Sequence, residues 1–249
     1  MIKIKSPGEI KTLKEGGKIL AEILAKIAEQ VLPGITTQDL DRLARELIKK
    51  EQARPSFLGY HGYPAALCTS VNEQVVHGIP GERMLEEGDL LSLDLGIEYR
   101  GLYTDCAVTL GVGHLRAEDE HLRRATALAL DWAIREMQPG VCWGDVAAKI
   151  QQLAESKGLA VIRDLVGHGV GFAVHEEPAL PNFGKPGTGE ILQEGMVLAV
   201  EPMFVLGDWK VETLSDGWTV VTADKKRAAH FEHTLAVTAS GTQILTTAV

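Results

Sequence analysis

Apolar residues at helical spacing predict two consecutive helices at the start of the chain. Residues 6–9 read Ser-Pro-Gly-Glu, a capping pattern with proline at the first helical position. One apolar face continues from there to Val31, and Pro33-Gly34 ends the helix. A second helix begins at Thr36 or Thr37. The other apolar positions of the two helices are Ile10, Leu13, Leu20, Leu24, Ile27, Leu40, Leu43 and Leu47.

The same order of patterns then occurs a second time. From Tyr60 to Leu110 the chain has short alternating runs separated by Gly and Pro, as strands do. The spacing predicts further helices over 118–137 and 145–156, followed by strand-like segments to the C-terminus. Two helices followed by strands, twice over, predict an α+β fold in which helices back one face of a sheet.

Three sequence matches indicate a duplicated unit. Residues 85–94 are echoed by 192–201, residues 33–39 by 139–145, and residues 75–77 by 173–175, at offsets of 107, 106 and 98. We therefore expect one pseudo-symmetric domain over residues 1–249, with repeats of about 6–112 and 117–249. The first match ends in Asp94 in one copy and in Glu201 in the other, which suggests a functional site between the halves.

Four acids lie inside otherwise apolar strands and share a face with small residues. In residues 90–95, Ser92 and Asp94 occupy one face of the strand, opposite three leucines. The corresponding acids and their small neighbours are Glu201 with Ala199, Asp105 with Ala107 and Thr109, and Glu232 with Thr234 and Ala236. We expect the large apolar face to pack on the helices and the small face to leave room for a ligand.

Converging carboxylates need protons or cations. Two carboxylates at about 4 Å repel by roughly 4 kcal/mol at an effective dielectric constant of about 20, so such a cluster shares protons or binds cations. Four negative charges balance two divalent ions, and oxygen ligands with one or two imidazoles favour Mn, Fe, Co or Zn. The candidate imidazoles are His77, His168 and His175. We expect structural roles for His114, His121, His230 and His233, and the role of His61 stays open.

Composition and missing motifs exclude several other classes of function. The net charge of −9 and the lack of a basic cluster argue against a nucleic-acid site. The sequence has no apolar run of membrane-spanning length, and its N-terminus lacks the apolar region of a signal peptide. Three separated cysteines favour reduced thiols in a cytoplasmic protein. Walker, G-x-S-x-G and H-E-x-x-H motifs are missing, so two-metal hydrolysis is the supported chemistry.

The acid and histidine motifs together resemble those of type I methionine aminopeptidases along essentially the whole chain. The motifs are Asp94, Asp105, Gly167-His168-Gly169, His175-Glu176-Glu177-Pro178, Glu201-Pro202 and Glu232-His233-Thr234. The resemblance implies a pseudo-twofold pita-bread fold, with a curved antiparallel sheet backed by two helix pairs. It also implies hydrolytic removal of the initiator methionine from nascent proteins when the second residue is small.

The resemblance further implies two divalent ions (Co, Mn, Fe or Zn) and assigns roles to their ligands. Asp94 is expected on the first metal, Asp105 and Glu232 between the metals, and His168 and Glu201 on the second. Glu201 is also the expected general base. His175 is expected to donate to the substrate carbonyl or tetrahedral intermediate, and His77 to contact the substrate backbone or amine. The implied methionine-binding residues are Phe57, Tyr60, Tyr63, Cys68, His77, Val174, His175 and Trp218.

Two positions in that pocket depart from the common bacterial pattern. Phe57 stands where cysteine is common, and Val174 stands where phenylalanine is common. We expect a volume exchange, in which an aromatic ring on one wall of the pocket replaces a ring on the other. The long flexible side chain of methionine still fits such a pocket.

Other functional classes fit the sequence less well. A non-catalytic binding protein of the same fold would be expected to lose metal ligands, yet all five are present. An aminopeptidase P or prolidase-like activity on X-Pro bonds normally comes with an extra N-terminal domain. The sequence also lacks the glycine motif that a nucleotide-binding α/β protein would need. We expect a monomer that acts on the N-terminal methionine of nascent chains, with a transient ribosome contact and no membrane attachment.

Overall fold

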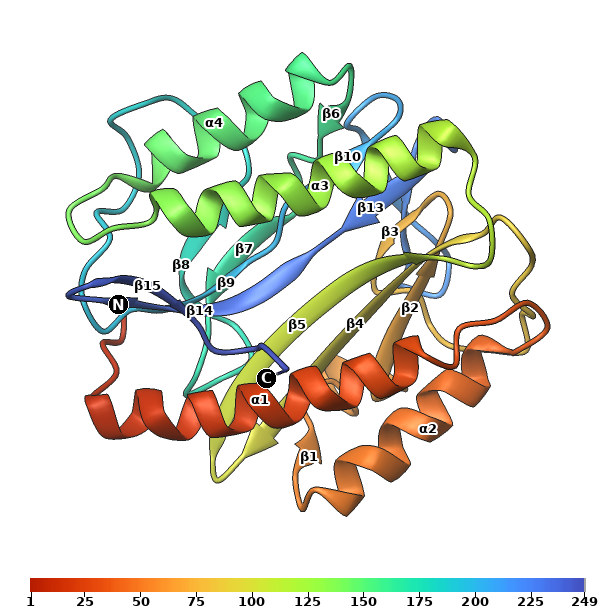
Figure 1. Cartoon of the computed structure of the whole chain (residues 1–249), viewed down its shortest axis with the longest axis horizontal. Coiled ribbons are helices and arrows are strands. Elements are labelled where there is room, and N and C mark those ends of the chain that lie inside the picture. The colour runs from red at the N-terminus through yellow and green to blue at the C-terminus, as the bar shows by residue number, and fades with distance from the viewer. Residues whose placement is uncertain (249) are drawn as a thin grey trace.

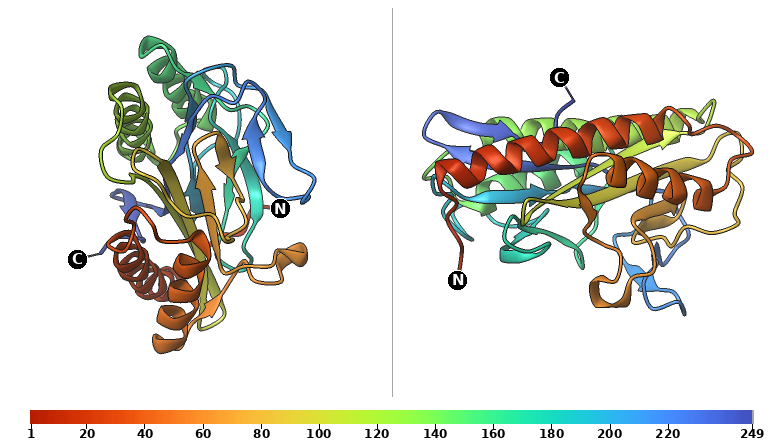
Figure 2. Two further views of the ribbon diagram at one scale, coloured as in Figure 1. Left: turned by 90° about the vertical axis from the view of Figure 1, so that its right-hand side faces the viewer. Right: turned by 90° about the horizontal axis from the view of Figure 1, so that it is seen from below.

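Two helix pairs cover one face of a curved antiparallel sheet in the computed structural model, which describes residues 1–248 (Figure 1 and Figure 2). Val249, the last residue of the predicted domain, lies outside this range. The helices are α1 (Pro7–Ala28), α2 (Thr37–Lys50), α3 (Ala117–Glu136) and α4 (Trp143–Ser156). All four predicted helices and the predicted α+β class are confirmed.

Capping side chains set the start of the first helix pair. Ser6 Oγ accepts from the Glu9 amide at 3.3 Å, while the Glu9 carboxylate accepts from the Ser6 amide at 2.7 Å. Thr36 and Asp39 make the same reciprocal pair at the start of α2. Thr36 is thus the capping residue, and the helix begins at Thr37.

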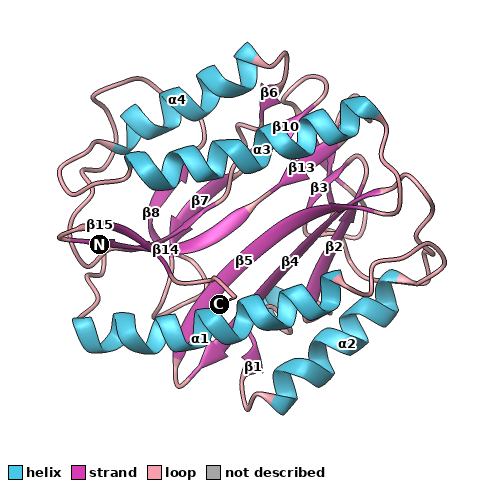
Figure 3. Ribbon diagram, in the orientation of Figure 1, coloured by secondary structure: helices cyan, strands magenta, loops and turns pink. Residues whose placement is uncertain are grey.

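The main sheet has nine strands, drawn from both halves of the chain (Figure 3). From the first half come β1 (Arg54–Pro55), β2 (Leu67–Val71), β4 (Leu90–Tyr99) and β5 (Leu102–Gly111). From the second come β7 (Val166–Gly169), β8 (Glu176–Pro181), β9 (Val197–Val200), β14 (Glu232–Thr238) and β15 (Gly241–Ile244). The order is β1-β4-β5-β14-β9-β7-β8, with β2 also on β4 and β15 also on β14. The halves therefore meet where β5 pairs with β14.

Two small sheets complete the fold. One joins β3 (Gln74–Val76), β12 (Val220–Thr222) and β11 (Val211–Thr213). The other joins β6 (Ala160–Val161), β10 (Met203–Val205) and β13 (Ala228–His230). The predicted strand region from Tyr60 begins instead with a 3₁₀ turn, η1 (Tyr60–Gly62), because positive φ angles at Gly59, His61 and Gly62 fold the chain back.

Each half packs its large apolar strand residues on its own helix pair. Leu91, Leu93 and Leu95 of β4 lie in one core with residues of α1 and α2. Leu198 and Val200 of β9 lie in a second core with residues of α3 and α4. Each such side chain contributes about 1.5–3 kcal/mol when fully buried. The predicted division into a helix-packed face and a face of small residues is confirmed.

Each half contains the same backbone hydrogen bond at an equivalent position. Gly34 N donates to Leu85 O at 2.8 Å, and Gly140 N donates to Leu192 O at 2.8 Å. Both glycines have positive φ angles, 94° and 89°, which favour glycine at this turn. These equivalent bonds support our proposal that residues 6–112 and 117–249 are two copies of one unit.

Candidate metal centre

Acidic and imidazole side chains from both halves line one pocket on the sheet face that carries the small residues. The pocket holds all five predicted metal ligands, both predicted catalytic histidines and most of the predicted methionine-binding residues. Its lining is Phe57, Tyr60, Tyr63, Cys68, Val76, His77, Asp94, Asp105, His168, His175, Glu201, Trp218 and Glu232. Sequence positions more than 130 residues apart therefore meet at one centre.

Strand pairing brings three of the acids together. Ala107 of β5 lies between Asp94 of β4 and Glu232 of β14 and pairs with both. Residues directly opposite in antiparallel strands share a face, so both acids project on the side of the small Ala107 methyl. Asp105, two residues before Ala107, projects on the same side, opposite Gly96.

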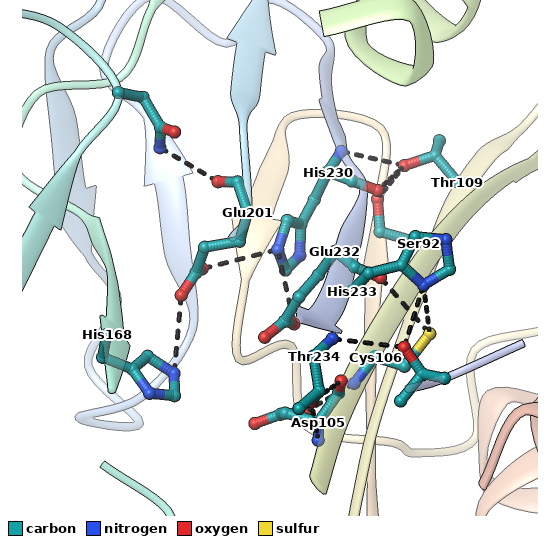
Figure 4. A network of polar contacts seen from close by, with 12 residues as sticks. Ser92, Asp105, Cys106, Thr109, His168, Glu201, His230, Glu232, His233 and Thr234 are labelled. Atoms are coloured by element: carbon teal, nitrogen blue, oxygen red, sulfur yellow. Dashed lines mark hydrogen bonds and ion pairs between the residues drawn. The ribbon is translucent and has the colours of Figure 1, made fainter. Parts of the chain in front are cut away.

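The second half adds its ligands by the same pairing rule. Ala199 of β9 pairs with His168 of β7 on one side and with Thr234 of β14 on the other. Glu201 lies two residues after Ala199 and therefore projects toward His168 (Figure 4). The Thr234 hydroxyl donates to the Asp105 carbonyl at 2.7 Å and accepts from the Asp105 amide at 2.8 Å, which fixes the junction of the halves.

The ligand atoms lie close enough to share cations. Atoms of Asp105, His168 and Glu232 lie within 4.8 Å of one another, and His168 Nε2 is 3.6 Å from Glu201 Oε1. His168 Nδ1 donates to the Gly169 carbonyl at 2.9 Å. This bond leaves the lone pair of Nε2 directed at the carboxylates, as in histidines that bind metal ions.

Burial dominates the electrostatics of the centre. Desolvation raises the pKa of Asp105 to about 7 and that of Glu201 to about 8. Desolvation, followed by repulsion from neighbouring carboxylates, holds the pKa values of Asp94 and Glu232 well above their usual range. Desolvation lowers the pKa of His168 to about 3, so its imidazole is neutral. No lysine or arginine lines the pocket.

Unpartnered oxygens distinguish this centre from a buried carboxylate in a structural role. Asp119, which is fully buried in α3, accepts from Arg116 at 2.9 Å and from Arg227 at 2.6 Å. In contrast, Asp94 Oδ1 and Glu232 Oε1 are buried without a hydrogen-bond partner. An unpaired buried charge is strongly unfavourable. Several acceptors without donors therefore fit divalent cations, which balance the charge and coordinate the free oxygens.

His230, for which we expected a structural role, lies beside the acids of the centre. Its side chain is 2% exposed, with Nε2 3.5 Å from Glu201 Oε2 and 3.9 Å from Glu232 Oε2. Thr109 holds its backbone through one hydrogen bond in each direction, at 2.9 and 2.7 Å. His230 stands two residues before Glu232, so strand alternation could have placed both side chains on one face.

The two predicted catalytic histidines approach the acids from loops. His175 Nδ1 lies 2.9 Å from the Tyr60 hydroxyl, and its ring centroid is 4.3 Å from that of His168. His77 has a φ of 58°, an uncommon backbone conformation for a residue other than glycine. Burial lowers the pKa of His77 to about 4, which keeps its imidazole neutral.

An apolar compartment adjoins the acids. Phe57, Tyr63, Cys68 and Val174 pack in one buried cluster, and Tyr60 and Trp218 lie against it. The Tyr63 and Trp218 rings are 5.1 Å apart in an edge-to-face arrangement. The residues predicted to bind methionine therefore come together, and the two that depart from the common pattern, Phe57 and Val174, share one cluster.

The raised carboxyl pKa values predict how the stability of the metal-free protein depends on pH. In the unfolded chain Asp and Glu titrate near pH 4, whereas folded Asp105 and Glu201 titrate at about 7 and 8. Between about pH 6.5 and 8 the folded state therefore binds more protons, and raising the pH destabilises it. Below about 6.5 the depressed histidine pKa values oppose this trend.

The melting temperature of chelator-treated protein should therefore fall between pH 6.5 and pH 8. Added Mn²⁺ should make this dependence on pH less steep. The variant Glu201→Gln should also reduce the slope, because it removes one of the titrating groups. A melting temperature that rises over this interval without metal would contradict the arrangement.

Comparisons with known proteins agree with this geometry. Residues 11–239 match the model of metallopeptidase family M24. Methionine aminopeptidase of Clostridium perfringens is 49% identical over 246 residues, 99% of each chain. The crystal structure of methionine aminopeptidase from Thermotoga maritima superposes with a TM-score of 0.98 at 48% identity, covering 99% of this chain and 100% of that chain.

A more distant likeness marks the extent of the fold. Prolidase from Pyrococcus furiosus has a TM-score of 0.79 at 21% identity, with 99% of this chain and 66% of that chain covered. This likeness concerns the fold alone, whereas the nearer relatives match along almost their whole length. The chain therefore belongs to metallopeptidase family M24, and the relatives that it matches from end to end are methionine aminopeptidases.

Proposed function

We propose that the protein is a metal-dependent methionyl aminopeptidase, which removes the N-terminal methionine of nascent polypeptides when the second residue is small. One observation carries the proposal: four buried carboxylates and a neutral imidazole converge beside an apolar compartment. Retention of all five candidate ligands argues against a non-catalytic binding protein. The similarity to whole-length methionine aminopeptidases supports the same conclusion.

Five side chains would hold two divalent ions, with Co, Mn, Fe and Zn as the candidate metals. Asp94, Asp105, His168, Glu201 and Glu232 would hold these ions, through carboxylate oxygens and one imidazole nitrogen. Bound divalent ions supply Lewis acidity and lower the pKa of water toward neutrality. The unpartnered oxygens of Asp94 and Glu232 fit this role.

Protein side chains then carry the proton transfers. Glu201 is the general base. Its neighbours His168 and His230 are neutral imidazoles, so no adjacent cationic side chain weakens the basicity of its carboxylate. His175 donates to the carbonyl oxygen, where negative charge develops as water attacks. Tyr60 fixes the ring of His175 through the 2.9 Å contact at Nδ1, which leaves Nε2 for the substrate. His77 contacts the backbone or amine of the substrate.

The geometry also favours cleavage of the first peptide bond. A methionine side chain in the compartment of Phe57, Tyr63 and Cys68 places its own amine and carbonyl near the acids. The four carboxylates attract the positive charge of a free N-terminal amine. Both contacts favour an N-terminal methionine over an internal one.

The cellular setting follows from this substrate. We propose a cytoplasmic monomer with a transient ribosome contact, since initiator methionine is exposed on nascent chains. No helix within residues 1–248 is long and apolar enough to cross a membrane.

Peptide hydrolysis before and after chelation tests the proposal. Met-Gly-Met-Met should be cleaved with release of methionine, Met-Leu-Met-Met far more slowly, and Gly-Pro peptides not at all. Chelation should abolish turnover, and a divalent ion should restore it. Chelation-resistant turnover would remove the metal mechanism, and a preference for X-Pro bonds would favour a prolidase-like enzyme.

Asp105→Ala removes one of the carboxylates that would hold the metal ions. The value of kcat/KM should fall about 1,000-fold or more, equivalent to about 4 kcal/mol of transition-state stabilisation. The metal-free variant should melt at a higher temperature than the wild type, because one repelling charge is gone. The matched control is Asp39→Ala, which removes the carboxylate that accepts from the Thr36 amide in the capping box of α2. It should lower the melting temperature modestly and leave kcat/KM unchanged, whereas an equal loss of activity in both variants would reject the assignment.

The proposed volume exchange in the apolar compartment is tested by two substitutions. Val174→Phe alone crowds a cluster that already contains Phe57, and KM should rise about tenfold. Adding Phe57→Cys should return KM close to the wild-type value. Additive losses in the double variant would show that the two positions do not share one volume.

A further inference from the structure

A buried ion pair joins the N-terminal segment to the loop that carries His175. Lys5 Nζ lies 2.8 Å from Glu176 Oε2, and the two side chains are only 1% and 3% exposed. The residues are 171 positions apart in the sequence. Burial lowers the pKa of the Lys5 ammonium, while the Glu176 carboxylate acts in the opposite direction. Lysine and glutamate are seldom buried unless they are paired.

The second oxygen of the same carboxylate closes the turn before His175. Glu176 Oε1 accepts from the backbone amides of Phe172 and Ala173, the latter at 2.9 Å. One carboxylate therefore fixes the start of the turn, and it belongs to the residue that directly follows His175. The conformation of residues 172–176 depends on where this carboxylate is held.

The lysine is itself fixed by its surroundings. Its amide donates to the Gly195 carbonyl at 2.8 Å, and α1 begins two residues later. Gly171 has a φ of 135°, which favours glycine, and a Cβ atom there would lie 2.7 Å from Lys5 Cε. Lys5 Nζ also lies 5.2 Å from the centre of the Phe172 ring. The ammonium is thus a rigid anchor for the turn.

We propose that Lys5 and Glu176 are a positioning pair that holds His175 over the metal-binding acids. His175 comes from a loop, and its contacts to Tyr60 and His168 require a defined ring position. A buried ion pair adds little net stability compared with apolar side chains of similar size. Its main effect here is therefore to fix the position of the turn before His175. The inference rests on the proposed function, because it concerns the role of His175 in that reaction.

Kinetics of Lys5→Met on Met-Gly-Met-Met test the proposal. The value of kcat should fall about 10-fold to 100-fold, as for other residues that orient catalytic groups, with KM changed less than about twofold. Lys5→Arg, which retains the charge, should recover a large part of kcat. An exposed lysine of α1 gives the control variant, Lys11→Met, which should keep the wild-type kcat.

A double-mutant cycle separates positioning from a general structural effect. In a His175→Ala background, Lys5→Met should cause no further loss of kcat, because the group that it positions is gone. An equal loss in both backgrounds would overturn the proposal. If Lys5→Met does not fold, the charge-neutral pair Lys5→Met/Glu176→Gln takes its place in the cycle.

A second readout does not depend on turnover. The imidazole NMR signals of His175 in metal-free protein should shift in Lys5→Met and stay unchanged in Lys11→Met, whereas unshifted signals in both would overturn the positioning role. Failure of the proposed function would be distinct, since it would appear as a wild-type protein without metal-dependent methionine release.

Discussion

Repulsion among four desolvated carboxylates is the constraint on which the rest of this structure depends. Side chains free to move would separate or take up water, yet here each acid stands on or at the end of a different strand of one sheet. Hydrogen bonds along the strands and two apolar cores hold the backbones in place. The stability of these cores offsets the unfavourable energy of the acids and keeps them assembled for cations.

Small residues are as important to the centre as the charged ones. Ala107, Gly96 and Ala199 stand directly beside or opposite the acids and the His168 imidazole. A large side chain at Ala107 or Ala199 would fill the space beside the acids, and a Cβ atom at Gly96 would lie 2.9 Å from Phe57 Cε1. On the opposite face the same strands carry leucines and valines that pack on the helices. The alternation of one strand therefore supplies both a core and a binding site.

Much of this arrangement could be predicted from the sequence because it follows local periodicity. Helical spacing predicted the four helices, and strand alternation predicted which residues share a face with Asp94, Asp105, Glu201 and Glu232. The register between strands and the two small sheets could not be predicted, because they depend on packing between distant segments. The place of His230 beside the acids could have been predicted from its spacing of two residues from Glu232, although a single histidine in an apolar run is more often structural. Neither helical spacing nor strand alternation predicts the contact of Lys5 with Glu176, because the two residues are 171 positions apart.

Division of the ligands between the halves has a consequence for how such a centre can arise. Asp94 and Asp105 come from the first half, and His168, Glu201 and Glu232 come from the second, so neither half alone carries the full set. The strands that join the halves, β5 and β14, pair antiparallel. The candidate centre therefore exists only after both halves have folded and these two strands have paired.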